Sequence, residues 1–152
     1  MPEPRTLTPG VRFLLNVGVP FLYLLPLLVA WFSPKHFGFG VAGLVPVALA
    51  VGFLGWLLWV AATFKLGSAL AVLPGASRLV AAGVYKYVRH PIYVGIFFTL
   101  LGLLAACGST FGVIYVFVVV LPLNVVRARL EERALLRQFG EGYRAYLDRT
   151  WF

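Results

Sequence analysis

Four long runs of apolar residues constrain the fold of this chain more than any other feature. They cover Val11–Phe32, Val41–Phe64, Ile92–Cys107 and Phe111–Val126. The first two exceed the roughly 20 residues that a helix needs to cross a bilayer. Only residues 108–110 separate the last two, which are too long together for a single span. The sequence therefore predicts a tight helical hairpin there and about four transmembrane helices in all.

The composition excludes an ordinary soluble domain and leaves room for one domain, residues 1–152. Hydrophobic residues make up 61% of the chain and charged residues only 12%, far from the proportions of a soluble globule. The net charge of +8 does not indicate nucleic acid, because the basic residues flank apolar runs as they do in membrane proteins. With Cys107 alone and two histidines, we expect no disulfide and no metal.

The basic residues also predict an orientation. Four spans place both termini and the Lys65–His90 connection on one side of the membrane. Of the 13 Lys and Arg residues, only Lys35 falls on the other side. By the positive-inside rule the richer side is cytoplasmic. We therefore expect a multi-pass protein of the cell inner membrane, or its equivalent, with cytoplasmic N- and C-termini.

Prolines and small residues predict how the helices bend and pack. Pro20, Pro26 and Pro46 lie within apolar runs and are expected to kink them, which membrane helices tolerate. The small residues of Val41–Gly55 are expected to let neighbouring helices approach closely. The connection before the third run contains Pro74-Gly75, a turn signal.

The first charged cluster opens the third apolar run as Arg89-His90-Pro91-Ile92-Tyr93-Val94-Gly95. Proline suits the first position of a helix, so His90 is expected at the N-cap. The free N–H groups of a helix start attract a carboxylate or phosphate, and Arg89 adds donors for the same anion. An interfacial anchor that touches lipid headgroups would account for these residues equally well.

The second charged cluster follows the fourth run and contains a Glu131-Glu132 pair. Headgroups are commonly anionic, so anchoring does not explain these carboxylates. They would balance a cationic ligand or accept hydrogen bonds from ribose hydroxyls. Arg127 and Glu131 are also spaced to pair along one helix, so part of the cluster fits a solvated salt-bridge face.

Together the two clusters resemble the membrane-embedded methyltransferases that include isoprenylcysteine carboxyl methyltransferase and the phospholipid N-methyltransferases. That family has an Arg-His-Pro-x-Tyr-x-Gly block, then an arginine, a Glu-Glu pair and Phe-Gly-x-x-Tyr-x-x-Tyr. The second block here is Arg127, Glu131, Glu132, Phe139, Gly140, Tyr143 and Tyr146. The resemblance covers about Ala82–Arg149, whereas the expected helical hairpin of residues 1–64 matches only in being apolar.

The resemblance implies an S-adenosylmethionine site on the cytosolic side. Arg89 and His90 would hold the methionyl carboxylate region, and Glu131 and Glu132 would meet the amine or ribose. The implied cofactor-binding residues are Tyr85, Arg89, His90, Pro91, Tyr93, Gly95, Glu131, Glu132, Tyr143 and Tyr146, and the implied catalytic residues are Arg127 and Glu132. Tyr93 would line the pocket, and the other three tyrosines would shape the adenosine pocket. Arg127 would orient or activate the acceptor.

The expected protein is thus an all-α, multi-pass membrane methyltransferase with a cytosolic helical extension at its C-terminal end. Its acceptor would be a lipophilic molecule from the bilayer. The most similar activity is isoprenylcysteine carboxyl O-methylation, followed by amino-lipid N-methylation. Two other classes remain as alternatives: an NADPH-dependent sterol-type reductase and a non-catalytic membrane subunit or lipid-binding protein. The family's Val-Pro-Arg-like tail is replaced by residues 148–152, where Trp151 and Phe152 are candidates to seal the adenosine pocket.

Overall fold

The structure is a computed structural model, and it describes residues 9–67 and 81–151, with side chains from Gly18 onward. The elements are α1 (Pro9–Phe32), α2 (Leu44–Leu66), the 3-10 helix η2 (Gly83–Lys86), α3 (Pro91–Ala106), α4 (Thr110–Tyr115), the π-helical turn η3 (Val116–Val120), α5 (Leu121–Phe139) and α6 (Glu141–Leu147). Within these ranges the only β pairing is an isolated bridge between Val88 and Trp151. The predicted all-α class is confirmed for this part of the chain.

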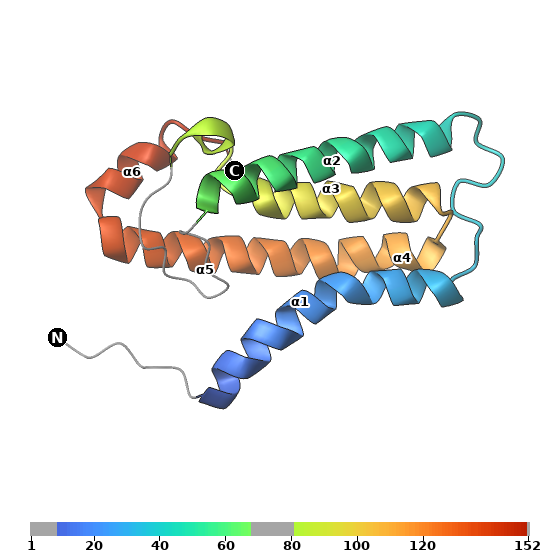
Figure 1. Cartoon of the computed structure of the whole chain (residues 1–152), viewed down its shortest axis with the longest axis horizontal. Helices are drawn as coiled ribbons and strands as arrows, with labels where there is room; N and C mark the ends of the chain where they lie inside the picture. The colour runs from blue at the N-terminus through green and yellow to red at the C-terminus, as the bar shows by residue number, and fades with distance from the viewer. Residues whose placement is uncertain (1–8, 68–80, 152) are drawn as a thin grey trace.

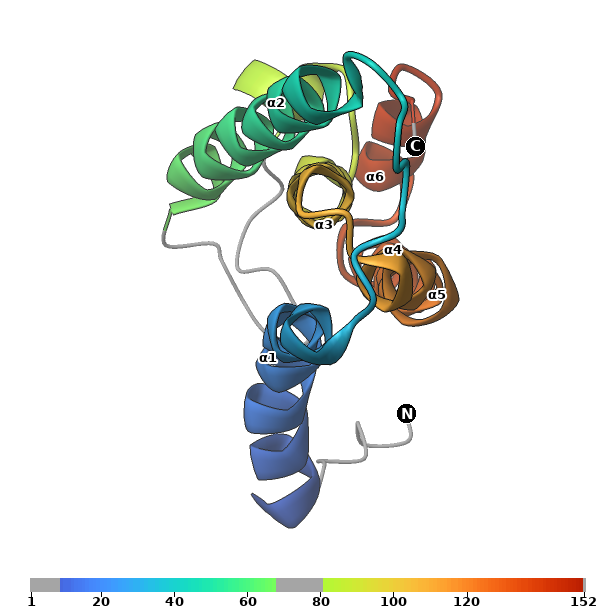
Figure 2. The ribbon, with the colours of Figure 1, turned by 90° about the vertical axis from the view of Figure 1, so that its right-hand side faces the viewer.

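The helices form a bundle in which α2, α3 and the continuous helix from α4 to α5 run side by side (Figure 1). Viewed along the bundle, α3 lies between α2 and the α4–α5 helix, whereas the first half of α1 diverges from the rest (Figure 2). The end of α2, η2, the start of α3, the end of α5 and α6 all lie at one end (Figure 1). This arrangement brings the two charged clusters of the sequence to the same end of the molecule.

Two of these helices are long and apolar enough to cross a membrane. They are Leu44–Leu66, with 23 residues, and the continuous helix Thr110–Phe139, with 30 residues. Two shorter apolar helices, Gly18–Phe32 and Pro91–Ala106, accompany them. Only 17% of the most apolar window of Leu44–Leu66 is buried inside the molecule. Its outward face carries large apolar side chains such as Phe53 and Leu54, which suits contact with lipid.

Glycines allow α2 and α3 to pack with their backbones in close approach. A Cβ atom on Gly55 would lie 2.6 Å from the Thr99 nitrogen of α3. A Cβ atom on Gly102 would meet the backbone of Ala48 and Gly52. Without a hydrophobic force between helices in lipid, such van der Waals contact is what holds a helix pair together. The expected close packing of small residues in Val41–Gly55 is therefore confirmed.

The predicted hairpin between the third and fourth runs is also confirmed. α3 ends at Ala106 and α4 begins at Thr110. Gly108 takes a φ of +66°, a left-handed conformation that glycine adopts without steric cost. The Ser109 side chain then caps α4, since its Oγ accepts a hydrogen bond of 3.1 Å from the Gly112 nitrogen. Capping satisfies one of the free N–H groups of the helix start.

The prolines have different effects at different positions. Pro20 and Pro26 lie inside α1, which bends along its length (Figure 1). Pro46 lies in the first turn of α2, where its missing N–H would have had no helical partner. The predicted kink at Pro46 is therefore wrong. The Pro74-Gly75 turn lies outside the described residues.

Another proline, Pro122, follows the π-helical turn η3 within the long helix. The wider i→i+5 turn is a common local response to an interruption of the helical ladder. The helix continues beyond it to Phe139. The second charged cluster therefore lies on the same continuous helix as the apolar run that precedes it.

Candidate active site

The first cluster lies at the start of α3, where the sequence placed it. His90 is the N-cap residue of α3 and Pro91 occupies the first turn, as predicted. The His90 side chain is almost fully buried, with 3% of its surface exposed. Its ring therefore lies inside the molecule rather than among lipid headgroups.

Each ring nitrogen of His90 faces one carboxylate of α5. Nε2 lies 3.3 Å from Oε1 of Glu132, and Nδ1 lies 3.7 Å from Oε2 of Glu131. The two carboxylates keep about a third of their side-chain surface exposed, at 32% for Glu131 and 27% for Glu132. The glutamate pair thus reaches across to α3, and it remains accessible to a ligand.

Tyr93 connects this pair to Arg127. The Tyr93 hydroxyl donates a hydrogen bond of 3.2 Å to Oε2 of Glu131 and accepts one of 3.4 Å from Nε of Arg127. The guanidinium carbon of Arg127 also lies 5.7 Å from the centre of the Tyr93 ring, within the range of a cation–π contact. The His90 and Tyr93 rings stack with centroids 5.7 Å apart. Acidic, basic and aromatic groups therefore alternate across one small region.

Arg89 contributes to the same region from the residue before the N-cap. Its Nη1 donates to Oε1 of Glu132 at 3.3 Å. Its other side-chain hydrogen bonds go to Leu147, the last residue of α6, and to Thr150 beyond it. The structure thus brings Arg89, His90, Glu131, Glu132, Tyr93 and Arg127 together.

Three further tyrosines of the predicted site gather beside η2 and α6. Tyr85 and Tyr143 are buried, and the Tyr143 and Tyr146 rings lie 5.7 Å apart. The Tyr146 hydroxyl donates a hydrogen bond of 2.6 Å to the Tyr85 carbonyl. Burial, with the nearby carboxylates, raises the pKa of Tyr85 and of Tyr143 above the usual range, and burial raises that of Tyr146 to about 12. These phenols are neutral hydrogen-bond donors at physiological pH.

Gly95 of α3 packs against α2. A Cβ atom there would lie 2.6 Å from the Trp59 nitrogen and 2.8 Å from the Gly55 carbonyl oxygen. The close approach that this glycine permits is therefore that of a neighbouring helix.

Two polar residues that the sequence interpretation did not select join the site to α1. The Tyr23 hydroxyl donates a hydrogen bond of 2.6 Å to Oδ1 of Asn124, and Nδ2 of Asn124 donates one of 3.0 Å to the Tyr93 carbonyl. Asn124 is buried. A polar side chain within an apolar run is costly in a membrane unless it has such partners, and that cost was the signal available in the sequence.

An apolar cleft of about 410 Å³ lies between α1, α2 and α3. Its lining residues are Pro20, Tyr23, Leu24, Leu27, Trp59, Ile96, Thr99, Leu100 and Leu103. Since Tyr23 lines the cleft and also binds Asn124, the cleft is linked to the polar site through one buried side chain.

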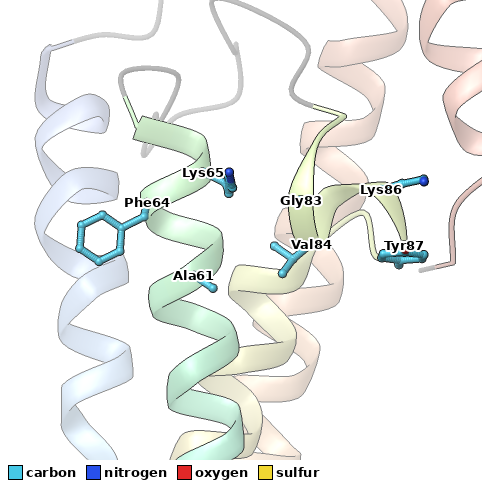
Figure 3. A pocket seen from close by; sticks show the side chains of 7 residues that line it. All are labelled: Ala61, Phe64, Lys65, Gly83, Val84, Lys86 and Tyr87. Carbon is cyan, nitrogen blue, oxygen red and sulfur yellow. The ribbon is translucent and has the colours of Figure 1, made fainter.

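A separate hollow of about 670 Å³ lies between the end of α2 and η2 (Figure 3). It is lined by Ala61, Phe64, Lys65, Gly83, Val84, Lys86 and Tyr87. It contains none of the predicted site residues. Its two lysines add positive charge to the end of the bundle that carries the site. Among the described residues, no group of three His, Cys, Asp or Glu side chains lies together as metal ligands do.

These features define an all-helical, largely apolar protein with facing basic and acidic side chains at one end of its bundle. The family described as phospholipid methyltransferase matches residues 40–142. This chain therefore belongs to the phospholipid methyltransferase family, as the two motifs predicted. The match begins ahead of Ala82 and includes α2, so the predicted extent of the resemblance was too short on its N-terminal side.

A curated relative supports the same assignment. The protein named Protein-S-isoprenylcysteine O-methyltransferase, from Schizosaccharomyces pombe (strain 972 / ATCC 24843), is 33% identical over 104 residues. The aligned part covers 64% of this chain and 44% of the relative. The chain thus matches less than half the length of that protein.

Proposed function

We propose that this chain is an S-adenosylmethionine-dependent methyltransferase that acts on a membrane-partitioned acceptor. The observation that carries the proposal is the meeting of Glu131 and Glu132 with His90 and Tyr93 at the start of α3. Membership in the phospholipid methyltransferase family supports transferase chemistry. The proposed donor follows from the chemistry of the residues that meet there.

The side chains of the site suit S-adenosylmethionine, which supplies a methyl group on a positively charged sulfonium when bound. The same molecule carries a cationic amine, and two partly exposed carboxylates favour such a pair of positive groups. In this proposal Glu131 and Glu132 bind the cationic end of the donor, with His90 and Pro91 fixing the start of α3. Tyr93 lines the pocket, and Tyr85, Tyr143 and Tyr146 shape the part that receives the adenosine.

We assign the acceptor to the Arg127 side of the site. A planar guanidinium binds a carboxylate in two places, and it repels the ammonium group of an amino-lipid. Arg127 therefore favours carboxyl O-methylation of an isoprenylcysteine over N-methylation of a phospholipid headgroup. The apolar cleft between α1, α2 and α3 provides space for a lipophilic chain, and Asn124 links that cleft to Tyr93.

The proposed catalysis depends on positioning rather than on proton transfer. Methyl transfer needs the acceptor atom in line with the sulfonium, and holding both partners together removes much of the entropic barrier. Arg127 would orient the acceptor, and Glu132 would hold the donor. The apolar surroundings would exclude water from the reacting atoms.

The proposed topology has four transmembrane helices, formed by α1, α2, α3 and the α4–α5 helix, with both termini in the cytoplasm. The charge asymmetry of the sequence and the gathering of the site at one end of the bundle (Figure 1) support it. If the chain is instead a non-catalytic lipid-binding protein, we expect the same topology but no binding of a methyl donor.

Donor binding is the first experiment. The full chain in nanodiscs is titrated with S-adenosylmethionine and, separately, with NADPH by calorimetry. We expect saturable binding of S-adenosylmethionine alone. Binding of NADPH would indicate the reductase class, and binding of neither would indicate a non-catalytic membrane protein.

The acceptor is then tested with Arg127→Lys and its control Arg129→Lys, an exposed arginine on the same helix. Labelled S-adenosylmethionine is supplied with isoprenylated thiol carboxylates or with amino-lipids. We expect Arg127→Lys to retain donor binding and to lower transfer at least about tenfold, equivalent to roughly 1.4 kcal/mol, whereas Arg129→Lys keeps wild-type turnover. Full turnover in the Arg127 variant would remove this residue from the acceptor site.

A further inference from the structure

Three of the four side-chain hydrogen bonds of Arg89 are directed at the last residue of α6 and the residues that follow it. Its Nε donates to Oγ1 of Thr150 at 3.1 Å, and its Nη2 donates to the carbonyls of Thr150 and Leu147 at 2.9 and 3.1 Å. Its Nη1 donates to Oε1 of Glu132 at 3.3 Å. A guanidinium has five N–H groups, and four are used by these bonds among the described residues.

The main chain attaches the same segment to the residues before α3. The Arg89 nitrogen donates to the Trp151 carbonyl at 3.0 Å, and the Trp151 nitrogen donates to the Tyr87 carbonyl at 2.8 Å. This is the isolated parallel bridge between Val88 and Trp151. Thr150 also donates from Oγ1 to the Tyr146 carbonyl at 2.8 Å. The stretch Leu147–Trp151 is thus bound along its length.

These hydrogen bonds also limit which further ligand Arg89 can bind. With one N–H group remaining, its guanidinium cannot bind a further carboxylate in two places unless it releases one of these partners. Bidentate binding is what makes arginine selective for carboxylates. The contacts of Arg89 therefore oppose its expected role of holding the carboxylate of a methyl donor.

We infer that Arg89 is a positioning residue that fixes the segment Leu147–Trp151 to Glu132 and so makes this segment a wall of the donor site. The inference rests on the proposed function for the identity of the donor. Arg89 acts through Glu132, which it holds beside His90, and through Thr150, which it holds beside Tyr146. It does not contact the donor itself.

The test compares two donors that differ in one group. Affinities of wild type and Arg89→Lys are measured for S-adenosylmethionine and for decarboxylated S-adenosylmethionine. If Arg89 is a positioning residue, Arg89→Lys should weaken the affinity for both donors by the same factor, about tenfold or more. A loss confined to the donor that has a carboxylate would overturn the inference, because it would show direct contact.

A second variant tests the segment independently of the arginine. Thr150→Val keeps the side-chain volume and removes the Oγ1 bonds, so we expect about a two- to tenfold loss of affinity for both donors. In the double variant with Arg89→Lys, the two losses of affinity should be less than additive, because both changes break the same contact between Arg89 and Thr150. Full additivity, or wild-type affinity in Thr150→Val, would contradict the role assigned to the segment.

The attachment itself is measured without any donor. Hydrogen exchange of the Arg89 and Trp151 amides should be slow in the wild type and faster in Arg89→Lys and Thr150→Val. Arg144→Lys is the matched control, since its pair with Glu141 is exposed and worth little. If exchange behaves in this way but the wild type binds neither donor, the proposed function fails and the attachment stands. Unprotected amides in the wild type would overturn the attachment.

Discussion

A substitution at Gly95 tests whether this glycine serves the packing of α3 against α2 or the binding of a ligand. In Gly95→Ala the new Cβ would lie 2.6 Å from the Trp59 nitrogen, about 1 Å inside an ordinary van der Waals contact. α2 must therefore move away, and a gap of 0.5–1 Å removes about a quarter to a half of each contact energy along the seam. Overpacking of this kind costs about 1–3 kcal/mol, which we expect as a lower free energy of unfolding in detergent titrations with SDS.

Two other glycines calibrate this prediction. At Gly52 the nearest atom to a Cβ would lie 3.3 Å away, so Gly52→Ala should cost less than Gly95→Ala. Gly142 lies in α6 with nothing within 4 Å of its Cβ position, and Gly142→Ala should stabilise the helix by about 0.5–1 kcal/mol. An unchanged unfolding free energy for Gly95→Ala, together with weaker donor binding, would refute the packing argument and assign Gly95 to the ligand.

Three further expectations follow from the site and the topology. Glu132→Ala should weaken S-adenosylmethionine binding about 10- to 100-fold, the equivalent of losing a charged hydrogen bond of 1.5–3 kcal/mol, as measured by calorimetry; wild-type affinity would support a mere salt-bridge face. Because burial raises the pKa of Tyr146 from 10.0 to about 12, the folded state keeps this proton longer than the unfolded state. Stability present below pH 10 is therefore lost as the pH rises to 12, and thermal unfolding of Tyr146→Phe should show a smaller alkaline loss. In a Cys107→Ser background, cysteines at Lys35 and Lys86 should react with an impermeant reagent from opposite sides of the membrane, and labelling of both from one side would contradict the topology.

The sequence predicted the helices well because length and apolarity act locally. The first three apolar runs became helices within a few residues of their predicted bounds, and the expected turn lies between Ala106 and Thr110. The fourth run also became a helix, but that helix continues beyond Val126 to Phe139 and includes the second charged cluster. The error at Pro46 arose because the start of α2 depends on Gly43, which takes a φ of +80° as its N-cap. A composition argument could not place that start, since Val41 is as apolar as the residues that follow it.

The site was predictable only in part, for a physical reason. The motifs identified His90 and the glutamate pair, but the direction in which a helix turns its side chains depends on its packing partners. Asn124 left a signal, because a buried amide in an apolar run must find partners. Thr150 left none, because a hydroxyl near the end of the chain matches no recognisable pattern, and the third of its bonds uses a backbone carbonyl, which every residue has.

The length of the α4–α5 helix accounts for the position of the proposed site at the end of the bundle. Its 30 residues span about 45 Å at 1.5 Å per residue, whereas the hydrocarbon core is about 30 Å thick and takes about 20 residues to cross. In the proposed topology a helix that enters at Thr110 leaves the hydrocarbon near Leu130, so Glu131 and Glu132 emerge at the boundary with water. Arg127 lies one turn earlier, within reach of lipid. If the proposed function is correct, one continuous helix would thus place the carboxylates where a water-soluble donor arrives and the guanidinium where a lipid-borne acceptor does.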